Sequence, residues 1–261
     1  MERTGGSRVV QGRHRSRRGF SVVELIISLA IVAILVGLLL PLLGHTRSIA
    51  HEAVCANNLR QIGLGWHAYF QEHEQFPRHT DEPDWQYGGV RFLGGGELAV
   101  LDAERPINPY MAGEAHAESG RVARTFACPA DVGIYLKGPR NAPKQSVLDD
   151  RTCFEAFGTS YRANTFLLDS TRAGIDDLAR PLKVAEVTAQ PSRLLLVADP
   201  IWYIASGAEG PKQGVLDASW HSEPSGGNMA AFDGSIRFVV FGPGPSDRYE
   251  LMPRPELADG D

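Results

Sequence analysis

Residues 18–43 read RGFSVVELIISLAIVAILVGLLLPLL, and the interpretation of the whole chain starts from this stretch. From residue 20 to residue 43 the only charged side chain is Glu24. A helix of that length extends roughly 36 Å, enough to cross a hydrocarbon core of about 30 Å with some tilt. The stretch therefore predicts a membrane-spanning helix at residues 20–43.

The residues before this apolar run are strongly basic. Residues 1–19 contain six arginines and one acid, a local net charge of +5, whereas the remainder of the chain carries −10. Because Lys and Arg beside a span stay on the cytoplasmic side, we expect the bulk of the chain to lie outside the cytoplasm. The acidic remainder also argues against a nucleic-acid partner, since phosphate binding requires clustered Lys and Arg.

Three kinds of segment compete for this run. A cleaved secretory signal has an apolar stretch of about 7–15 residues before a small-residue cleavage site, so this run is too long, although Ser48-Ile49-Ala50 would serve as the site. A plain membrane anchor explains the length and the arginines. It gives no reason for Glu24, because a charge at the centre of a span costs about 2.5–3.5 kcal/mol and usually marks a function.

The third kind is a prepilin signal, and Arg18-Gly19-Phe20-Ser21-Val22-Val23-Glu24-Leu25 resembles the motif of the type IV prepilin family, which includes type IV pilins and the pseudopilins of type II secretion. The resemblance implies that a prepilin peptidase cuts after Gly19 and that Phe20 becomes the methylated N-terminus. It also implies that Glu24 serves assembly. In a filament core without water, the Glu24 carboxylate and the Phe20 amine of a neighbouring subunit would relieve each other's desolvation cost.

Pro41 lies twenty-one residues after Phe20, where members of this family also often carry a proline. A proline removes a backbone donor and clashes with the preceding helical turn. We therefore expect Pro41 to kink or locally melt the helix. The alternative is that it ends the span.

Beyond Gly44, apolar residues recur at steps of three or four, which predicts an amphipathic helix that continues the span and terminates by Pro77. The apolar stripe of this helix needs a cover. The stripe comprises Ile49, Ala53, Ala56, Leu59, Ile62, Trp66 and Tyr69.

Short β-rich runs later in the chain predict that cover, an antiparallel sheet packed on the helix. Between the last two runs, Asp233-Gly234 predicts a hairpin with a two-residue type I′ turn. The runs are residues 161–168, 193–199, 229–232 and 235–241.

The expected fold is α+β and pilin-like, with a long N-terminal helix, its first half membrane-spanning, packed on an antiparallel β-sheet. Residues 77–160 are rich in Gly and Pro and predict long loops with short elements. The expected organisation is a basic leader at 1–19, a transmembrane and assembly helix at 20–43, a globular domain at 44–241 and an exposed tail at 242–261.

A second resemblance covers the globular part. The segments CANNLRQIG (55–63), FACPAD (126–131) and SYRAN (160–164), and His221 ahead of NMAAFDGS (228–235), resemble a large pseudopilin-like family abundant in planctomycetes, which has a prepilin N-terminus and a C-terminal H-then-DG motif.

The three cysteines permit one disulfide in an exported domain, and spacing alone does not determine which two of Cys55, Cys128 and Cys153 pair. Because Cys55 and Cys128 lie in the recurring motifs of the second family, the resemblance implies that these two form the bond.

Asp199, His221 and Asp233 are candidate metal ligands that would converge at sheet ends. Some pseudopilins hold calcium in C-terminal loops, although calcium favours oxygen ligands over imidazole. The favoured interpretation gives them structural roles, with Asp233 in a turn, Asp199 ending a strand and His221 as a loop hydrogen-bonder. We therefore expect no cofactor. If these residues do bind a metal ion, calcium is the candidate.

Enzymatic alternatives have little support in the sequence. His221 could act as a base with Ser222 or Cys153 as nucleophile, but neither lies in a nucleophile elbow or a cysteine signature. A zinc site from Cys128, Cys153 and a histidine lacks the paired C-x₂-C spacing of structural zinc sites. We expect a protein that is not an enzyme.

These observations predict a structural subunit of a type IV pilus-like or type II secretion pseudopilus filament. We expect it in the inner membrane, with its C-terminal domain periplasmic, or in a cell-surface filament. The expected partners are the prepilin peptidase, other pilin subunits, an inner-membrane assembly platform with its ATPase, and membrane lipid. The alternatives are a membrane-tethered exported domain that binds calcium or a polysaccharide without polymerising, and an exported hydrolase.

Overall fold

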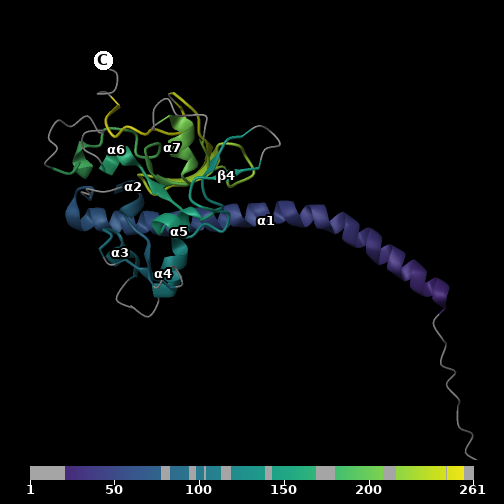
Figure 1. Cartoon of the computed structure of the whole chain (residues 1–261). Coiled ribbons are helices and arrows are strands. Elements are labelled where there is room, and N and C mark those ends of the chain that lie inside the picture. Colours follow the sequence, from purple (N-terminus) through teal and green to yellow (C-terminus); the bar gives the residue numbers. More distant parts are fainter. Residues whose placement is uncertain are drawn as a thin grey trace, which may run out of the picture. The chain divides into compact units, whose positions relative to one another are not determined.

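The computed structural model describes residues 21–77, 83–93, 98–102, 104–112, 119–138, 143–168, 180–207, 216–244 and 246–255 (Figure 1). The chain divides into two compact units, Met1–Thr46 and Arg47–Asp261. The predicted leader at 1–19, with Gly19 and Phe20 at its cleavage junction, lies outside the described residues.

Helix α1 (Val22–His73) contains both the predicted span and the predicted amphipathic helix. It starts with reciprocal capping, in which the Ser21 hydroxyl accepts the Val23 N–H at 3.3 Å and the Glu24 carboxylate accepts the Ser21 N–H at 3.2 Å. At the other end Glu74 adopts a left-handed conformation with φ 55°. This residue stops the helix four positions after Phe70, whose carbonyl accepts the Glu74 N–H.

The first part of α1 has the length and composition of a membrane span. Residues Val22–Leu39 have a mean hydropathy of 2.9, with 0 % of the window buried. The helical conformation continues through Pro41, so the expectation of local melting at that residue is wrong, whereas the alternative that the proline ends the membrane span stays a prediction. Neighbouring turns hold the helix where the proline lacks its donor, and a kink at Pro41 stays a prediction.

Within the unit Arg47–Asp261, four antiparallel strands form a sheet in the order β5-β6-β8-β9. One face packs on the second half of α1, where Leu59, Ile62 and Trp66 share a core with Leu196 and Ala230. This arrangement confirms the α+β fold with a long helix on an antiparallel sheet. The strands are β5 (Arg162–Ala163), β6 (Leu195–Ala198), β8 (Gly226–Ala231) and β9 (Ile236–Val240).

The opposite face of the sheet is covered by helix α7 (Ile201–Ser206), which packs Ile201 and Trp202 against Met229 and Ala231 of β8 (Figure 1). Because successive strand residues point to opposite faces, Ala230 joins the core beneath α1 while its two neighbours join the core beneath α7. All six residues of β8 are therefore buried.

The buried stripe of α1 starts later than predicted. Leu59, Ile62, Trp66 and Tyr69 are buried, whereas Ile49 is 55 % exposed. Ala53 is exposed as well, and the first fully buried side chain is that of Cys55. The expected spacing is correct, but among residues 46–73 of α1 the core covers the helix only from Cys55 onward.

Two local predictions about the sheet are wrong in detail. The run 161–168 forms the short strand β5 followed by helix α6 (Thr165–Leu168), because the Asn164 side chain turns the chain by accepting the Phe166 N–H. The β8–β9 hairpin exists, but its loop includes Phe232. Only Gly234 there has positive φ, 84°, which fits a type I turn followed by a left-handed glycine rather than a type I′ turn.

In the described parts of residues 77–160 the helices and strands are short, which agrees with the prediction of short elements. Strands β1 and β2 form a hairpin, and β3 pairs with both β4 and β7 in a second small sheet. The elements are α2 (Pro83–Gln86), β1 (Val90–Leu93), β2 (Leu98–Leu101), α3 (Asn108–Ala112), α4 (Ser119–Thr125), β3 (Tyr135–Leu136), β4 (Gln145–Ser146), α5 (Cys153–Phe157), and farther on the 3₁₀ helix η3 (Val184–Glu186) and β7 (Leu216–Asp217).

The tail predicted to be exposed is packed on the domain in its described part, residues 242–244 and 246–255. Tyr249 is 5 % exposed, and the carbonyl of Glu250 accepts the N–H of Leu195 at 2.9 Å. The Asn164 amide also donates to the carbonyl of Leu251. Pro and Gly in this segment allow it to follow the domain surface, and backbone hydrogen bonds fix it there, while residues 256–261 lie outside the described part.

Candidate functional site

The first candidate site is the exposed apolar surface of α1 around Glu24. The carboxylate accepts the Ser21 N–H, and the Ser28 hydroxyl donates to the Glu24 carbonyl at 2.8 Å. Large apolar side chains surround it, each about half exposed or more. They are Val22, Val23, Leu25, Ile26, Ile27, Leu29, Ile31, Val32, Ile34, Leu35, Val36, Leu38 and Leu39.

Such a surface requires a cover, because monomeric soluble proteins seldom expose large contiguous apolar patches. Lipid or other apolar helices would supply this cover without leaving unsatisfied backbone groups, since a helix pairs its own N–H and C=O groups. Glu24 is the single carboxylate within this surface. The apolar side chains suit lipid or another apolar surface, and the Glu24 carboxylate can pair with one cationic group.

The second candidate site is a buried polar cluster at the end of β6. Asp199 follows the strand, and its Oδ2 lies 3.0 Å from Nε2 of His221. The same oxygen accepts the backbone N–H of Asn228 in β8 at 2.7 Å. The His221 and Asp199 side chains are each 1 % exposed. The sheet therefore orients a histidine through a carboxylate held on the neighbouring strand.

Burial and Asp199 have opposite effects on the pKa of His221. Burial lowers the pKa of His221, but the hydrogen bond and the charge of Asp199, with a smaller contribution from Glu52, raise the pKa above its ordinary value of 6.5. Among the described residues, Nδ1 of His221 and Oδ1 of Asp199 are buried without a hydrogen-bond partner. One imidazole nitrogen thus remains available to another group.

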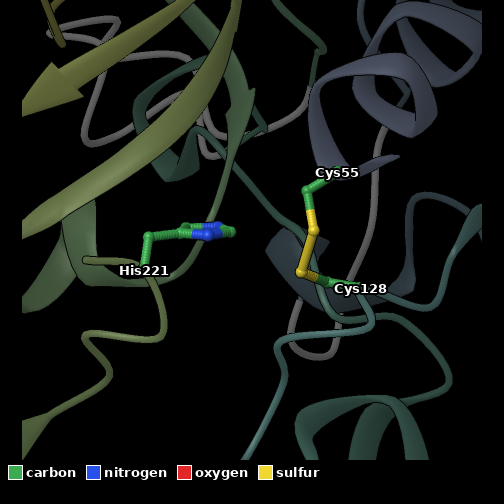
Figure 2. Close-up of side chains that lie close together, drawn as sticks. All are labelled: Cys55, Cys128 and His221. Carbon is green, nitrogen blue, oxygen red and sulfur yellow. A yellow bond between two sulfur atoms is a disulfide. The ribbon is translucent and has the colours of Figure 1, made fainter. Parts of the chain in front are cut away.

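A disulfide joins Cys55 of α1 to Cys128, which follows α4, with a Cα–Cα distance of 5.3 Å. This bond confirms the pairing that the resemblance implied. Cys153 is free and buried, and burial raises the pKa of its thiol well above the usual value. The bond is close to the second site, because the two sulfur atoms and a ring nitrogen of His221 all lie within 4.8 Å of one another (Figure 2).

The predicted metal ligands do not all meet. Asp199 and His221 come together, but Asp233 lies in the β8–β9 loop, where its Oδ1 accepts the N–H and the hydroxyl of Ser235. In the β6–β8 pairing, Ala198 is opposite Met229 and Leu195 is opposite Ala231. Asp199 and Asp233 therefore occupy opposite ends of a strand pair that extends about 3.4 Å per residue, so the set with Asp233 is wrong.

The recurring motif segments meet in the core instead of in a cleft. Asn58 Nδ2 donates to the Ala127 carbonyl and to the Tyr161 hydroxyl, each at 3.0 Å. Asp131 accepts the Ser160 hydroxyl at 2.7 Å and two backbone N–H groups at the start of α5. Burial raises the pKa of Asp131 more than these hydrogen bonds lower it. These motif residues hold α1, the loop after α4 and the start of β5 together.

Sequence reasoning missed two members of the second site. The sequence places Cys55 in a disulfide but not beside His221, and it places Asn228 in a motif without a role at this site. The available signal was that both lie in the segments of the second resemblance. Their proximity depends on how α1 crosses the sheet, which no local pattern reports.

Comparison with known families agrees with both parts of the chain. A model described as "Prokaryotic N-terminal methylation motif" matches residues 14–40, and one described as "Protein of unknown function (DUF1559)" matches residues 45–181, more than half of the chain. No curated protein and no solved structure matches the chain. Families with the prepilin-type motif are generally structural and not enzymatic.

Proposed function

This chain belongs to the DUF1559 family and carries a prepilin-type N-terminal methylation motif, and on that premise we propose that it is a structural subunit of a type IV pilus-like or type II secretion pseudopilus filament. The motif implies processing by a prepilin peptidase and assembly with other pilins. The observation that carries the proposal is one carboxylate, Glu24, within an otherwise apolar and exposed helical surface.

In this proposal the peptidase cuts after Gly19 and Phe20 becomes the N-methylated terminus. The apolar surface of Val22–Leu39 is stored in the inner membrane and later covered by the helices of neighbouring subunits. An assembly platform driven by its ATPase makes the transfer. The same side chains suit both environments because lipid tails and packed helices are similarly apolar.

Glu24 sets the axial position of one subunit against the next. A carboxylate that enters a core without water carries a large desolvation cost unless an opposite charge meets it. The terminal amine of Phe20 is the cation created by processing. A register shift of one subunit would separate these charges, so their pairing selects one register.

Two features support a membrane orientation with the C-terminal unit outside the cytoplasm. The six arginines of the leader lie on one side of the span, and such residues favour the cytoplasmic side. The Cys55–Cys128 disulfide is typical of an oxidising compartment. A periplasmic or surface position follows in this proposal.

The first experiment is to measure the intact mass and the N-terminal residue of the protein from native membranes. A mature chain that begins at N-methylated Phe20 supports prepilin processing. A chain that begins near His51, or an uncut Met1, contradicts it.

The second experiment tests assembly with Glu24→Gln, and Ser28→Ala serves as the matched control. Ser28 lies one turn away on α1 and bonds only the carbonyl of Glu24 in the described structure, so its loss leaves the carboxylate in place. We expect Glu24→Gln to be processed and inserted but absent from sheared filament fractions, and Ser28→Ala to assemble. Normal function of Glu24→Gln without filaments would instead favour a tethered domain that does not polymerise.

A further inference from the structure

The cluster of Cys55, Cys128 and His221 brings three potential ligands of a soft metal ion to one place. The two sulfur atoms and a ring nitrogen lie within 4.8 Å of one another, and all three side chains are buried. They come from α1, from the loop after α4 and from the segment before β8. Figure 2 shows the imidazole of His221 directed toward the disulfide.

The imidazole is prepared for such a role. Its Nε2 is hydrogen-bonded to Asp199 at 3.0 Å, and its Nδ1 is buried with no partner among the described residues. A histidine that binds a metal through one nitrogen usually gives its other nitrogen to a carboxylate, which fixes the tautomer and the ring orientation. Asp199 is itself held by the Asn228 backbone N–H at 2.7 Å, so the orienting carboxylate has a fixed position.

We propose that this cluster is a redox-controlled metal site, in which the reduced thiolates of Cys55 and Cys128 and Nδ1 of His221 bind a thiophilic divalent ion such as Zn²⁺. Zinc–sulfur and zinc–nitrogen distances of about 2.3 and 2.0 Å place two sulfurs and one nitrogen around one tetrahedral ion about 3.5–3.8 Å apart. The three ligand atoms already lie within 4.8 Å of one another, so side-chain rotations after reduction can bring them to this spacing. Asp199 positions the imidazole without binding the ion.

The chemical step is a two-electron reduction. A dithiol attacks the Cys55–Cys128 bond, the S–S bond breaks, and the dithiol becomes a disulfide while both cysteines become thiols. Zn²⁺ then displaces to solvent the two thiol protons and any proton on Nδ1 of His221, and forms two Zn–S bonds and one Zn–N bond. Reoxidation of the thiolates by a disulfide of the same class reverses the sequence and releases the ion.

A pocket at the surface lies beside Cys128. A surface pocket of about 440 Å³ has Cys128, Asn58 and Pro129 in its lining. A small reductant or a metal ion can approach Cys128 through this pocket, although the cysteine side chain is itself buried. Cys153 is also buried and is not among the three ligands.

The test uses the full-length protein in detergent micelles with Cys153→Ala, so that the third thiol cannot contribute. A phosphine replaces the dithiol as reductant because dithiols bind zinc themselves. Zinc affinity is measured by competition with a chromophoric chelator, and Co²⁺ absorption bands report thiolate ligands and tetrahedral geometry. We expect one equivalent to bind the reduced protein, and at least a hundredfold weaker binding to the oxidised protein.

The histidine is tested separately from the thiols. His221→Ala should weaken zinc binding at least tenfold, and Asp199→Asn should weaken it by about 10–100-fold through the lost orientation of the ring. Near-ultraviolet circular dichroism establishes whether each variant is folded. If a folded His221→Ala protein binds zinc as tightly as the parent, two thiols alone hold the ion and the three-ligand site is wrong.

A further measurement uses the parent protein, so that the test does not depend on whether the variants fold. In the reduced parent protein, one equivalent of Zn²⁺ should slow alkylation of both Cys55 and Cys128 at least tenfold, read by mass spectrometry of the peptides. Equal alkylation rates with and without zinc would overturn the proposal. The result is independent of filament assembly, so failure here leaves the proposed function intact, and failure of assembly leaves this site intact.

Discussion

The Nε2 atom of His221 lies 3.0 Å from Oδ2 of Asp199, and both side chains are 1 % exposed. The pair connects the segment before β8 to the end of β6, and Asn228 extends it by donating its N–H to the same oxygen. A buried ion pair adds little net stability, because desolvation of both groups offsets their attraction. Removal of one partner is nevertheless costly, because the other group then stays buried without a hydrogen-bond partner. The pair is therefore a sensitive point of the domain.

We expect Asp199→Ala to lower the free energy of unfolding by about 3–5 kcal/mol, because it leaves the buried imidazole and the Asn228 N–H without their acceptor. The matched control is Asp217→Ala, which removes a carboxylate that accepts only the local Ser219 N–H in the described structure. That change should cost less than about 1 kcal/mol. Urea unfolding of the full chain in detergent measures both, and equal effects would contradict a special role for the pair.

The Cys55–Cys128 disulfide closes a loop of 73 residues and should contribute strongly to stability. We expect the double substitution Cys55→Ala with Cys128→Ala to lower the unfolding free energy by about 4 kcal/mol, chiefly through the entropy of the unfolded chain. Cys153→Ala, the control at the free buried cysteine, should cost about 1 kcal/mol. Thermal unfolding monitored by circular dichroism distinguishes them. A double variant as stable as the control would show that the bond adds little.

Gly158 is required where α5 ends against β1. Its φ is 80°, and a Cβ there would lie 1.9 Å from the carbonyl oxygen of Val90. We expect Gly158→Ala to destabilise the fold by about 2 kcal/mol or more through backbone strain and this clash. Gly242 is the control, because a Cβ there meets no atom of the described residues within 4 Å, and Gly242→Ala should change stability by less than about 0.5 kcal/mol. Denaturant midpoints compare the two variants.

The acid sensitivity of the domain has one contribution that can be assigned. Arg180 donates two hydrogen bonds of 2.7 Å to Glu186, and with the Lys183 backbone N–H they lower the pKa of Glu186 from 4.5 to about 2. A depressed carboxyl pKa stabilises the fold fully above about pH 4.5, and this contribution is lost as pH falls toward 2. The pair is partly exposed, so we expect less than about 1 kcal/mol.

The measurement is a double-mutant cycle with Glu186→Gln, Arg180→Gln and the double variant, unfolded at pH 7 and at pH 3. The coupling energy between the two positions should be present at pH 7 and smaller at pH 3. A coupling energy that does not change with pH would contradict the assignment.

Much of the helical part of the fold was predictable from sequence because the signals there are local. The continuous helix, its end before Pro77 and the strand at Leu195–Ala198 follow from apolar periodicity and β-branched or aliphatic runs. The prediction of a strand over the whole run 161–168 is wrong because the Asn164 side chain ends the strand. Its amide nitrogen donates to the distant Leu195 carbonyl, and its amide oxygen accepts the local Phe166 N–H. Such partners cannot be read from the run itself.

For the tail, the prediction from sequence underestimates the order that the structure shows. Residues 242–261 have the composition of an exposed end, but Tyr249 is buried and Glu250 bonds to the start of β6. The composition of a segment indicates how much apolar surface it can bury. It does not indicate whether the edge of a sheet is available to pair with the backbone of the segment, because that edge is formed by strands far away in the chain.

By itself the sequence determined the apolar span, the position of Glu24 within it and the resemblance that pairs Cys55 with Cys128. Only the tertiary structure decided that His221 meets Asp199 and the disulfide, and that Asp233 does not. The physical reason is one of range. Hydropathy and charge act through the residues that carry them, whereas side chains 70 or more positions apart, such as Cys55 and Cys128, come within bonding distance only after a helix and a sheet have packed on each other.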